Sequence, residues 1–246
     1  MSLSIIIPVF NEIKFLPEIL SKIIKETSKI KNEIIIVDDC STDGSKEWLE
    51  NINKSKTKYF FFKKKKIIVK NLKIFFRKKN EGKGAAFKHA LNYCKNEIVI
   101  IQDADLEYDP KDISKLLNKI NEGNDVVFGN RFHKKNYQNY RYKIFAMASF
   151  FLSKIISLLF LYKITDAAVC YKMFRKDVFK RNISLNEDNF MIDFEFVLKV
   201  LKKKQLFKIS EVNVYYKGRT FEEGKKISWV DGFRALILIL KIRLFY

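Results

Sequence analysis

Residues 98–107 read IVIIQDADLE, an apolar run that gives way to carboxylates spaced two residues apart. Four β-branched residues in succession indicate a strand buried on both faces, as in a parallel sheet. Side chains alternate along an extended chain, so we expect Asp103, Asp105 and Glu107 to point to one side where the strand ends. Ligand sites in open α/β sheets lie at the carboxyl ends of strands. These acids therefore favour a site for a divalent cation that bridges a diphosphate.

The chain of 246 residues is long enough for one large α/β domain, and 48% of its residues are hydrophobic. Its formal charge of +20 comes mainly from lysine. Arginine, which is favoured for phosphate and base contacts, is scarce. The charge therefore indicates a compositional bias, and we expect no nucleic-acid partner. A basic surface would still attract anionic lipid headgroups or a sugar nucleotide.

The three cysteines, Cys40, Cys94 and Cys170, are far apart and form no C-x-x-C pattern. They indicate free thiols in a reducing compartment. The sequence enters a strand at its start without a basic region or a cleavage site, so we predict no signal peptide and a cytoplasmic location.

Hydrophobic spacing predicts alternating strands and helices along the first half of the chain. Strands are expected at 4–9, 33–37, 74–77, 98–101 and 125–129. Helices are expected at 13–30, from an N-cap at 41–44 through 49, from 80–86 to about 94, and at 110–120. This order predicts an α/β fold with a mostly parallel sheet and right-handed crossovers. The lysine-rich residues 54–79 are expected to form a surface hairpin or insertion.

Two later stretches are apolar enough to interact with a membrane. Residues 144–162 are nearly continuous apolar sequence, interrupted by Lys154 and by serines at every fourth position. They predict an amphipathic helix that is either buried or lies in a bilayer interface. A helix that crossed the bilayer would separate the later basic residues from the acidic strand end. A second amphipathic helix is expected over 229–246. This helix could pack against the core or lie on a membrane surface, and the sequence leaves both possibilities open.

Three further motifs are candidates for contacts with a nucleotide. Asp38 and Asp39 follow an early strand, where an acid can accept hydrogen bonds from a ribose or a base. Residues 80–84 (NEGKG) allow close backbone approach at a helix N-terminus, where anions bind. Residues 217–226 (KGRTFEEGKK) form a glycine-bounded loop whose cations could neutralise a departing diphosphate. Each motif alone is also compatible with an ordinary turn or exposed loop.

Six motifs occur in an order that resembles a known family. They are PVFNE (8–12), DDCSTDG (38–44), NEGKGAA (80–86), DAD (103–105), GNR (129–131) and TD (165–166). The chain is similar to the inverting family-two glycosyltransferases with a GT-A fold, and most similar to their dolichol-phosphate mannose/glucose synthase branch. The resemblance implies one GT-A domain over 1–246. Its nucleotide-sugar-binding half would be 1–132, and its acceptor-binding half, with interfacial helices, would be 133–246.

The resemblance also implies roles for particular residues. Those implied to bind the nucleotide sugar are Pro8, Phe10, Glu12, Val37, Asp39, Lys83 and Ala104. Those implied to hold Mg²⁺ or Mn²⁺ are Asp103, Asp105 and Glu107. Those implied to meet the donor diphosphate and the acceptor phosphate are Arg131, Arg219 and Lys225. Two features depart from the branch: Glu107 stands where glutamine is common, which could alter metal affinity, and residues 54–79 are longer than expected.

The predicted reaction moves a hexose from a UDP- or GDP-sugar to a polyprenyl phosphate at the cytoplasmic face of a membrane, with Asp105, Arg131, Asp193 and Glu195 as catalytic residues. A lipid phosphate is already an anion and needs no general base. A hydroxyl acceptor would need one, and Asp193 or Glu195 is the candidate. Two alternatives stay open: a transferase that builds a surface polysaccharide or glycan on a hydroxyl acceptor, and a non-enzymatic basic protein that binds membranes or nucleic acid. The sequence leaves the sugar and the nucleotide open.

Overall fold

A computed structural model describes residues 2–181, 183–226 and 228–245. At its centre is a seven-stranded sheet with the order β5-β2-β1-β6-β8-β7-β9. Its strands are β1 (Ser2–Val9), β2 (Lys31–Asp38), β5 (Leu72–Phe76), β6 (Ile98–Ile101), β7 (Val126–Asn130), β8 (Lys172–Arg175) and β9 (Ile209–Asn213). β8 runs antiparallel to both of its neighbours, and the other pairs are parallel. The mostly parallel sheet predicted from the sequence is confirmed.

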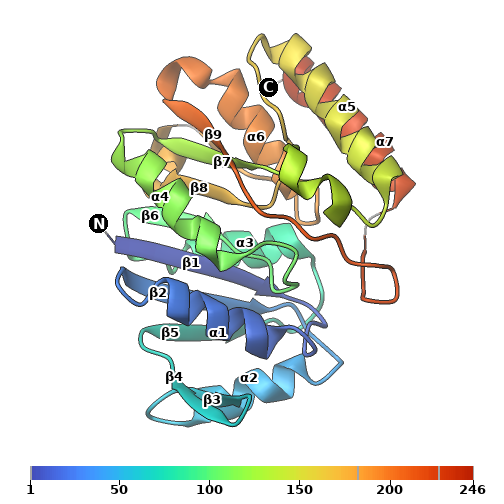
Figure 1. The fold of residues 1–246 in the computed structure, drawn as a ribbon. Coiled ribbons are helices and arrows are strands. Elements are labelled where there is room, and N and C mark those ends of the chain that lie inside the picture. Colours follow the sequence, from blue (N-terminus) through green and yellow to red (C-terminus); the bar gives the residue numbers. More distant parts are fainter. Residues whose placement is uncertain (1, 182, 227, 246) are drawn as a thin grey trace.

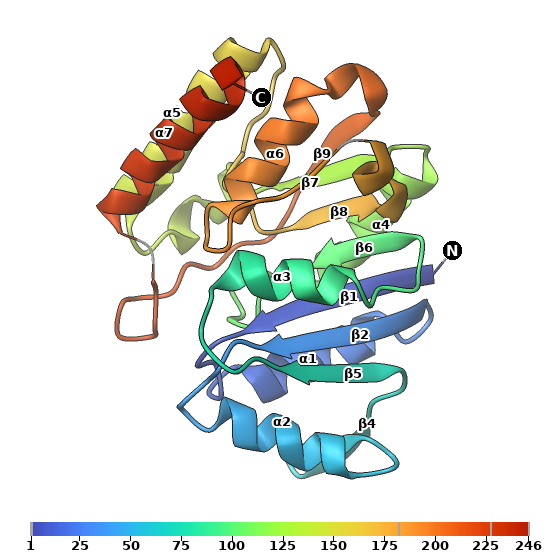
Figure 2. The same ribbon diagram turned by 180° about the vertical axis from the view of Figure 1, so that it is seen from behind.

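Helices cover both faces of this sheet. They are α1 (Leu16–Glu26), α2 (Ser45–Lys54), α3 (Lys83–Leu91), α4 (Ile113–Asn121), α5 (Lys143–Phe160), α6 (Ile192–Lys202) and α7 (Trp229–Phe245). α1 and α4 lie on one face, and α3 and α6 lie on the other (Figures 1 and 2). Because helices cover both faces, the central strands carry continuous apolar sequence, and the four residues of β6 are all buried.

The lysine-rich insertion forms a separate antiparallel hairpin, as the sequence predicted. It consists of β3 (Tyr59–Phe62) and β4 (Lys65–Ile68), which pair only with each other. Phe60 is buried and packs edge-on against Trp48 of α2, with 5.2 Å between ring centroids. The hairpin therefore attaches beyond β5, at the end of the sheet far from α5 and α7 (Figure 1).

Two strands, β8 and β9, were not predicted. β8 enters between β6 and β7, and β9 pairs in parallel with β7. β8 has only four residues and contains the charged Lys172, so its sequence lacks a clear strand pattern. Because β8 is antiparallel, the residues before it lie at the carboxyl end of β6, whereas Lys176 after it donates to the Glu97 carbonyl at the amino end of β6.

α5 and α7 lie side by side along one end of the molecule, next to α6 (Figures 1 and 2). Among the described residues, α5 is the one helix long and apolar enough to cross a membrane, and 22% of that apolar window is buried. However, β7 before α5 and β8 after it are hydrogen-bonded in the same sheet. In this fold α5 therefore packs alongside the domain, which agrees with the predicted amphipathic helix.

Candidate active site

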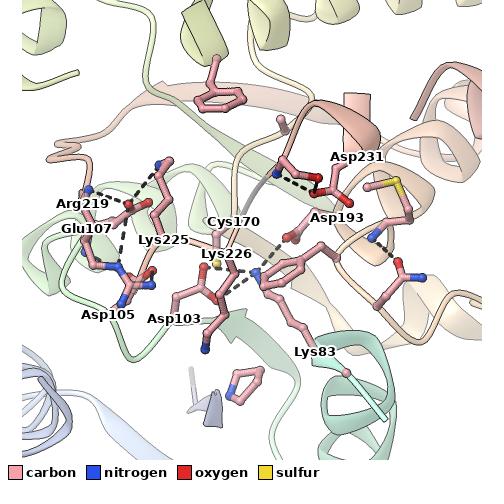
Figure 3. Close-up of a pocket in the computed structure, with 18 of the residues that line it drawn as sticks. Lys83, Asp103, Asp105, Glu107, Cys170, Asp193, Arg219, Lys225, Lys226 and Asp231 are labelled. Atoms are coloured by element: carbon pink, nitrogen blue, oxygen red, sulfur yellow. Dashed lines mark hydrogen bonds and ion pairs between the residues drawn. The ribbon is translucent and has the colours of Figure 1, made fainter. Parts of the chain in front are cut away.

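A cavity of about 720 Å³ lies at the carboxyl edge of the parallel strands. Its walls come from the residues that follow β1, β2 and β6, from α3, α5, α6 and α7, and from the segment 216–232 (Figure 3). This is the edge at which open α/β sheets place their ligands.

The cavity gathers nearly all of the residues that the sequence singled out. Those that line it are Pro8, Phe10, Glu12, Asp39, Lys83, Asp103, Ala104, Asp105, Glu107, Arg131, Asp193, Arg219 and Lys225. Val37 and Glu195 do not line it. Val37 is fully buried in β2, and the Glu195 carboxylate accepts hydrogen bonds from the backbone of Asn186 and Glu187 and pairs with Lys199. Val37 therefore lies outside the cavity, and the Glu195 carboxylate is already engaged by these partners.

The acids after β6 converge through a turn, and the predicted alternation along a strand is wrong here. β6 ends at Ile101, and Leu106 has a left-handed backbone with φ of 61°. The backbone N–H of Glu107 donates to Oδ1 of Asp105 at 3.0 Å. A leucine in this conformation is strained, and such strain is common at functional sites.

Arg219 lies among three carboxylates of the cavity (Figure 3). Its terminal nitrogens lie 2.8 Å from Oε2 of Glu12 and 3.0 Å from Oδ2 of Asp105, and its Nε lies 3.9 Å from Oε1 of Glu107. Lys225 Nζ lies 3.4 Å from the same Glu107 oxygen. Burial, together with the negative charges of Glu107 and Asp103, raises the pKa of Asp105 to about 8. The effects of burial and of the neighbouring acids on this pKa thus outweigh the opposite effect of the single nearby guanidinium.

The chemistry of this cluster fits a hard divalent cation, because carboxylate oxygens are its preferred ligands and a cation would relieve their repulsion. In the part of the chain that the structure describes, however, no three Asp, Glu, His or Cys side chains are already arranged around one metal position. The physical reason lies in the ion pairs: Arg219 holds Asp105, and Lys83 holds Asp103 at 2.9 Å.

In the glycine-containing segment 80–84, backbone groups predicted to approach an anion already have a partner within the protein. The backbone N–H groups of Glu81 and Gly82 donate to the carboxylate of Asp39, the latter at 2.6 Å. A Cβ on Gly84 would lie 2.3 Å from the carbonyl oxygen of Glu187. The anion at this helix N-terminus is therefore Asp39 itself, and the glycine allows close approach of the chain that precedes α6.

A buried chain of charges links the two halves of the cavity. Lys83 Nζ contacts Asp103 at 2.9 Å and Asp193 Oδ2 at 2.8 Å, and Lys172 Nζ contacts Asp193 Oδ1 at 2.8 Å. Burial opposes ionisation of Asp193, but the two ammonium groups outweigh it and lower the pKa of this carboxyl. Sequence reasoning missed Lys172. The available signal was a lone lysine inside the apolar run VCYKMF.

Arg131 is held rigidly at the wall of the cavity. Its Nε and one terminal nitrogen donate to the two oxygens of Asp166 at 2.7 and 2.8 Å, and the Asp166 side chain is completely buried. The guanidinium carbon also lies 5.2 Å from the ring centroid of Tyr216. The motifs GNR and TD therefore meet in space, 35 residues apart in sequence.

The end of the cavity beside α5 and α7 is mainly apolar, with Ser149, Ser228 and Asp231 as polar residues in its lining. Its wall includes Ile144, Phe145, Ala148, Leu152, Phe190, Met191, Phe194 and Trp229. The sequence suggested that these helices could contact a membrane. It did not indicate that they lie beside the acidic residues at the edge of the sheet. One continuous cavity therefore has a charged end and a hydrocarbon-lined end.

Comparison with known proteins gives a family and two named relatives. The family described as Glycosyl transferase family 2 matches residues 4–183. Dolichol-phosphate mannosyltransferase of Pyrococcus furiosus is 28% identical over 229 residues, which cover 92% of this chain and 59% of that protein. Undecaprenyl-phosphate 4-deoxy-4-formamido-L-arabinose transferase of Proteus mirabilis is 32% identical over 126 residues, which cover 50% of this chain and 35% of that protein. The chain thus spans only part of each relative's length.

Solved structures share the fold. Glucosyl-3-phosphoglycerate synthase from Mycobacterium tuberculosis, in complex with Mn²⁺, UDP and phosphoglyceric acid, superposes with a TM-score of 0.69 at 15% identity, over 99% of this chain and 78% of that one. TarS from S. aureus, in complex with UDP-GlcNAc, gives 0.59 at 21% identity, over 98% and 66%. At these identities the likeness shows the fold alone, and it confirms the predicted GT-A architecture.

Proposed function

Because the chain belongs to glycosyl transferase family 2, we propose that it transfers a hexose from a UDP- or GDP-sugar to a polyprenyl phosphate, peripherally at the cytoplasmic face of a membrane. The observation that carries this proposal is the two-part cavity, which is charged at the strand edge and apolar beside α5 and α7. An acceptor with a phosphate head and a hydrocarbon tail matches both ends. The two named relatives act on dolichol phosphate and undecaprenyl phosphate, which have this chemistry.

The surroundings of Asp193 favour a phosphate acceptor over a hydroxyl. A general base needs a carboxylate oxygen that can take a proton from the acceptor. Both oxygens of Asp193 contact lysine ammonium groups, and the pKa of the carboxyl is lowered, so it is a weak base. A phosphate oxygen is already anionic and can attack the anomeric carbon directly. The bond to the nucleoside diphosphate then breaks on the opposite face, which inverts the configuration and requires no proton transfer.

The charged end of the cavity supplies the donor site in this proposal. Pro8 at the end of β1 would surround the nucleoside together with Phe10, Glu12 and Asp39, which follow β1 and β2, and Lys83 and Ala104 would lie beside the sugar diphosphate. Asp103, Asp105 and Glu107 would hold Mg²⁺ or Mn²⁺. A bound divalent ion would stabilise negative charge on the departing diphosphate.

Three cations complete the site, Arg131 from the end of the 1–132 half and two from the 133–246 half. Arg131, Arg219 and Lys225 line the same cavity and would meet the donor diphosphate and the acceptor phosphate. This arrangement supports the proposed division into a donor-binding half at 1–132 and an acceptor-binding half at 133–246, both contributing to one domain.

The outer surface of α5 and α7 supports membrane contact. Each helix carries an exposed apolar stripe at helical spacing: Ile144, Met147, Phe151 and Leu158 on α5, and Trp229, Phe233, Ile237, Leu240 and Leu244 on α7. Exposed basic residues accompany the stripes, and α5 contains no acidic residue. An apolar face with basic neighbours fits the interface of an anionic bilayer, where the cavity's apolar end could receive a lipid tail.

A transfer assay tests the proposal. Purified protein is incubated with UDP- and GDP-hexoses, Mn²⁺ or Mg²⁺, and a short polyprenyl phosphate, and the lipid product is identified by mass spectrometry. The matched acceptor is the same polyprenol without its phosphate, and the matched variant is Asp105→Asn. We expect transfer to the phosphate only, and none by the variant, which should keep the wild-type circular dichroism spectrum.

The possible results separate the parts of the proposal. Transfer to polyprenol or to a glycan hydroxyl, but not to the phosphate, would overturn the acceptor assignment. Normal turnover by Asp105→Asn would overturn the metal-site assignment. Equal rates with and without EDTA would remove the divalent cation from the reaction.

A further inference from the structure

The guanidinium of Arg219 occupies the space between the carboxylates of the donor site. It contacts Glu12 at 2.8 Å and Asp105 at 3.0 Å, and 11% of its side chain is exposed. Burial lowers the pKa of Arg219, but the charges of Asp105 and Glu12 raise this pKa by more. The group therefore remains a cation. Arg219 is therefore the resident counter-charge of the acids that the proposed function assigns to a divalent ion.

The backbone at Arg219 is fixed independently of its side chain. The Arg219 N–H donates to Oε1 of Glu107 at 2.8 Å, and the Lys217 N–H donates to the Glu107 carbonyl at 2.9 Å. An antiparallel bridge joins Tyr108 to Tyr216 just before it. The guanidinium can therefore leave the carboxylates by side-chain rotation, while the main chain stays in place.

A divalent ion and the guanidinium cannot share these oxygens without strong repulsion, because like charges at a few ångströms in a partly buried site repel by several kcal/mol. Guanidinium groups pair well with phosphate oxygens through two parallel hydrogen bonds. A donor diphosphate would thus give the displaced Arg219 a new partner. Glu12 would keep Lys226, whose Nζ lies 3.4 Å from Oε1.

We propose that Arg219 competes with the divalent ion for Asp105 and Glu107, so that the ion binds tightly only together with a nucleoside diphosphate that accepts the guanidinium. This inference rests on the proposed function for the location of the ion. It accounts for a cluster of acids that has the right ligand chemistry yet no ready-made metal geometry among the described residues.

The experiment measures Mn²⁺ binding by the loss of the free-ion EPR signal, with and without UDP or GDP, corrected for Mn²⁺ bound by the nucleotide in solution. The variant is Arg219→Gln. The matched control is Lys217→Gln, which removes one positive charge from the same segment and whose exposed side chain has no described contact with the cluster. Arg219→Lys keeps the charge. Thermal melting checks that each protein is folded.

Without nucleotide, Arg219→Gln should bind Mn²⁺ about tenfold more tightly than wild type, a typical coupling between two binding events. The nucleoside diphosphate should strengthen Mn²⁺ binding to wild type and to Lys217→Gln, but by much less to Arg219→Gln. Arg219→Lys should resemble wild type.

Nucleotide-free Mn²⁺ binding by Arg219→Gln that is equal to or weaker than that of wild type would overturn the inference. A nucleotide-free gain in Lys217→Gln as large as the gain in Arg219→Gln would also overturn it, because it would indicate a long-range charge effect. If Asp105→Asn binds Mn²⁺ as wild type does, the ion lies elsewhere. That result, or the absence of Mn²⁺ binding in every protein and condition, would contradict the metal site of the proposed function itself. If the Mn²⁺ affinity falls in Asp105→Asn but is unchanged in Arg219→Gln, only the proposed competition between Arg219 and the ion is contradicted.

Discussion

The ammonium group of Lys172, whose side chain has no exposed surface, lies 2.8 Å from Oδ1 of Asp193. Lys172 comes from β8, the antiparallel strand between β6 and β7, and Asp193 comes from the first turn of α6. Lys83 takes the other oxygen of Asp193 and also contacts Asp103. A charged pair buried in the protein therefore fixes the acceptor side of the cavity to the donor side.

Replacing Lys172 by methionine should lower the free energy of unfolding by up to about 3–5 kcal/mol, because it removes one of the two ammonium partners of the buried Asp193 carboxylate. The double variant Lys172→Met/Asp193→Asn should be less destabilised than the sum of the two single variants, since Lys83 and Asp103 still balance each other. Urea unfolding of the four proteins measures this. Strictly additive changes would show that the two residues do not interact.

Asp193→Asn should reduce turnover with polyprenyl phosphate by less than the roughly 10²- to 10⁴-fold that loss of a general base costs. Asparagine keeps the shape of the side chain, and one oxygen can still accept from a lysine. The pH dependence of kcat should keep the same form as in wild type. If kcat rises with pH in wild type but no longer does so in Asp193→Asn, Asp193 is instead identified as the general base.

Stability should fall as the pH rises in the absence of metal. Burial and the charges of Glu107 and Asp103 raise the pKa of Asp105 from 3.8 to about 8, so the folded state holds this proton more tightly than the unfolded state does. Asp105 therefore favours folding fully at low pH, and its contribution is lost as the pH rises toward 8.

The check is urea unfolding of wild type and Asp105→Asn between about pH 5 and pH 9. Relative to the variant, wild type should lose stability with increasing pH and then level off above about 8, where Asp105 is ionised in both states. Parallel curves for the two proteins would contradict the shifted pKa.

Phe151→Glu on α5 should weaken binding to vesicles that contain anionic lipid, since it places a charge in the apolar stripe proposed to enter the bilayer interface. Phe61→Glu on β3 is the matched control, because the Phe151 and Phe61 side chains are 65% and 63% exposed. α5 and β3 lie at opposite ends of the molecule (Figure 1). Flotation of each protein with phosphatidylglycerol and phosphatidylcholine vesicles measures binding. A greater loss for Phe61→Glu would place the membrane contact on the hairpin instead.

The sequence alone determined the order of strands and helices through β7 and the edge at which the cavity forms. Apolar spacing is local, and parallel strands joined by crossover helices bring their carboxyl ends to one edge. Asp39, Asp103 and Asp105 could therefore be placed together before the structure was known. The local pattern could not show that Leu106 turns the chain or that Asp39 accepts hydrogen bonds from the backbone just before α3, because both depend on backbone geometry beyond strand alternation.

Only the tertiary structure decided the second half of the site. β8 runs antiparallel to its two neighbours in the sheet. Packing between segments that are distant in sequence determines those neighbours, so the spacing of apolar residues could not predict them. Arg219 meets Glu12 across 207 residues, and Lys172 meets Asp193 inside the core. Charges in such contacts find partners only when folding brings separate elements together and excludes water between them. This is why the sequence could indicate that Lys83, Arg219 and Lys225 belong to the site but could not show which acids they contact, and why it missed Lys172.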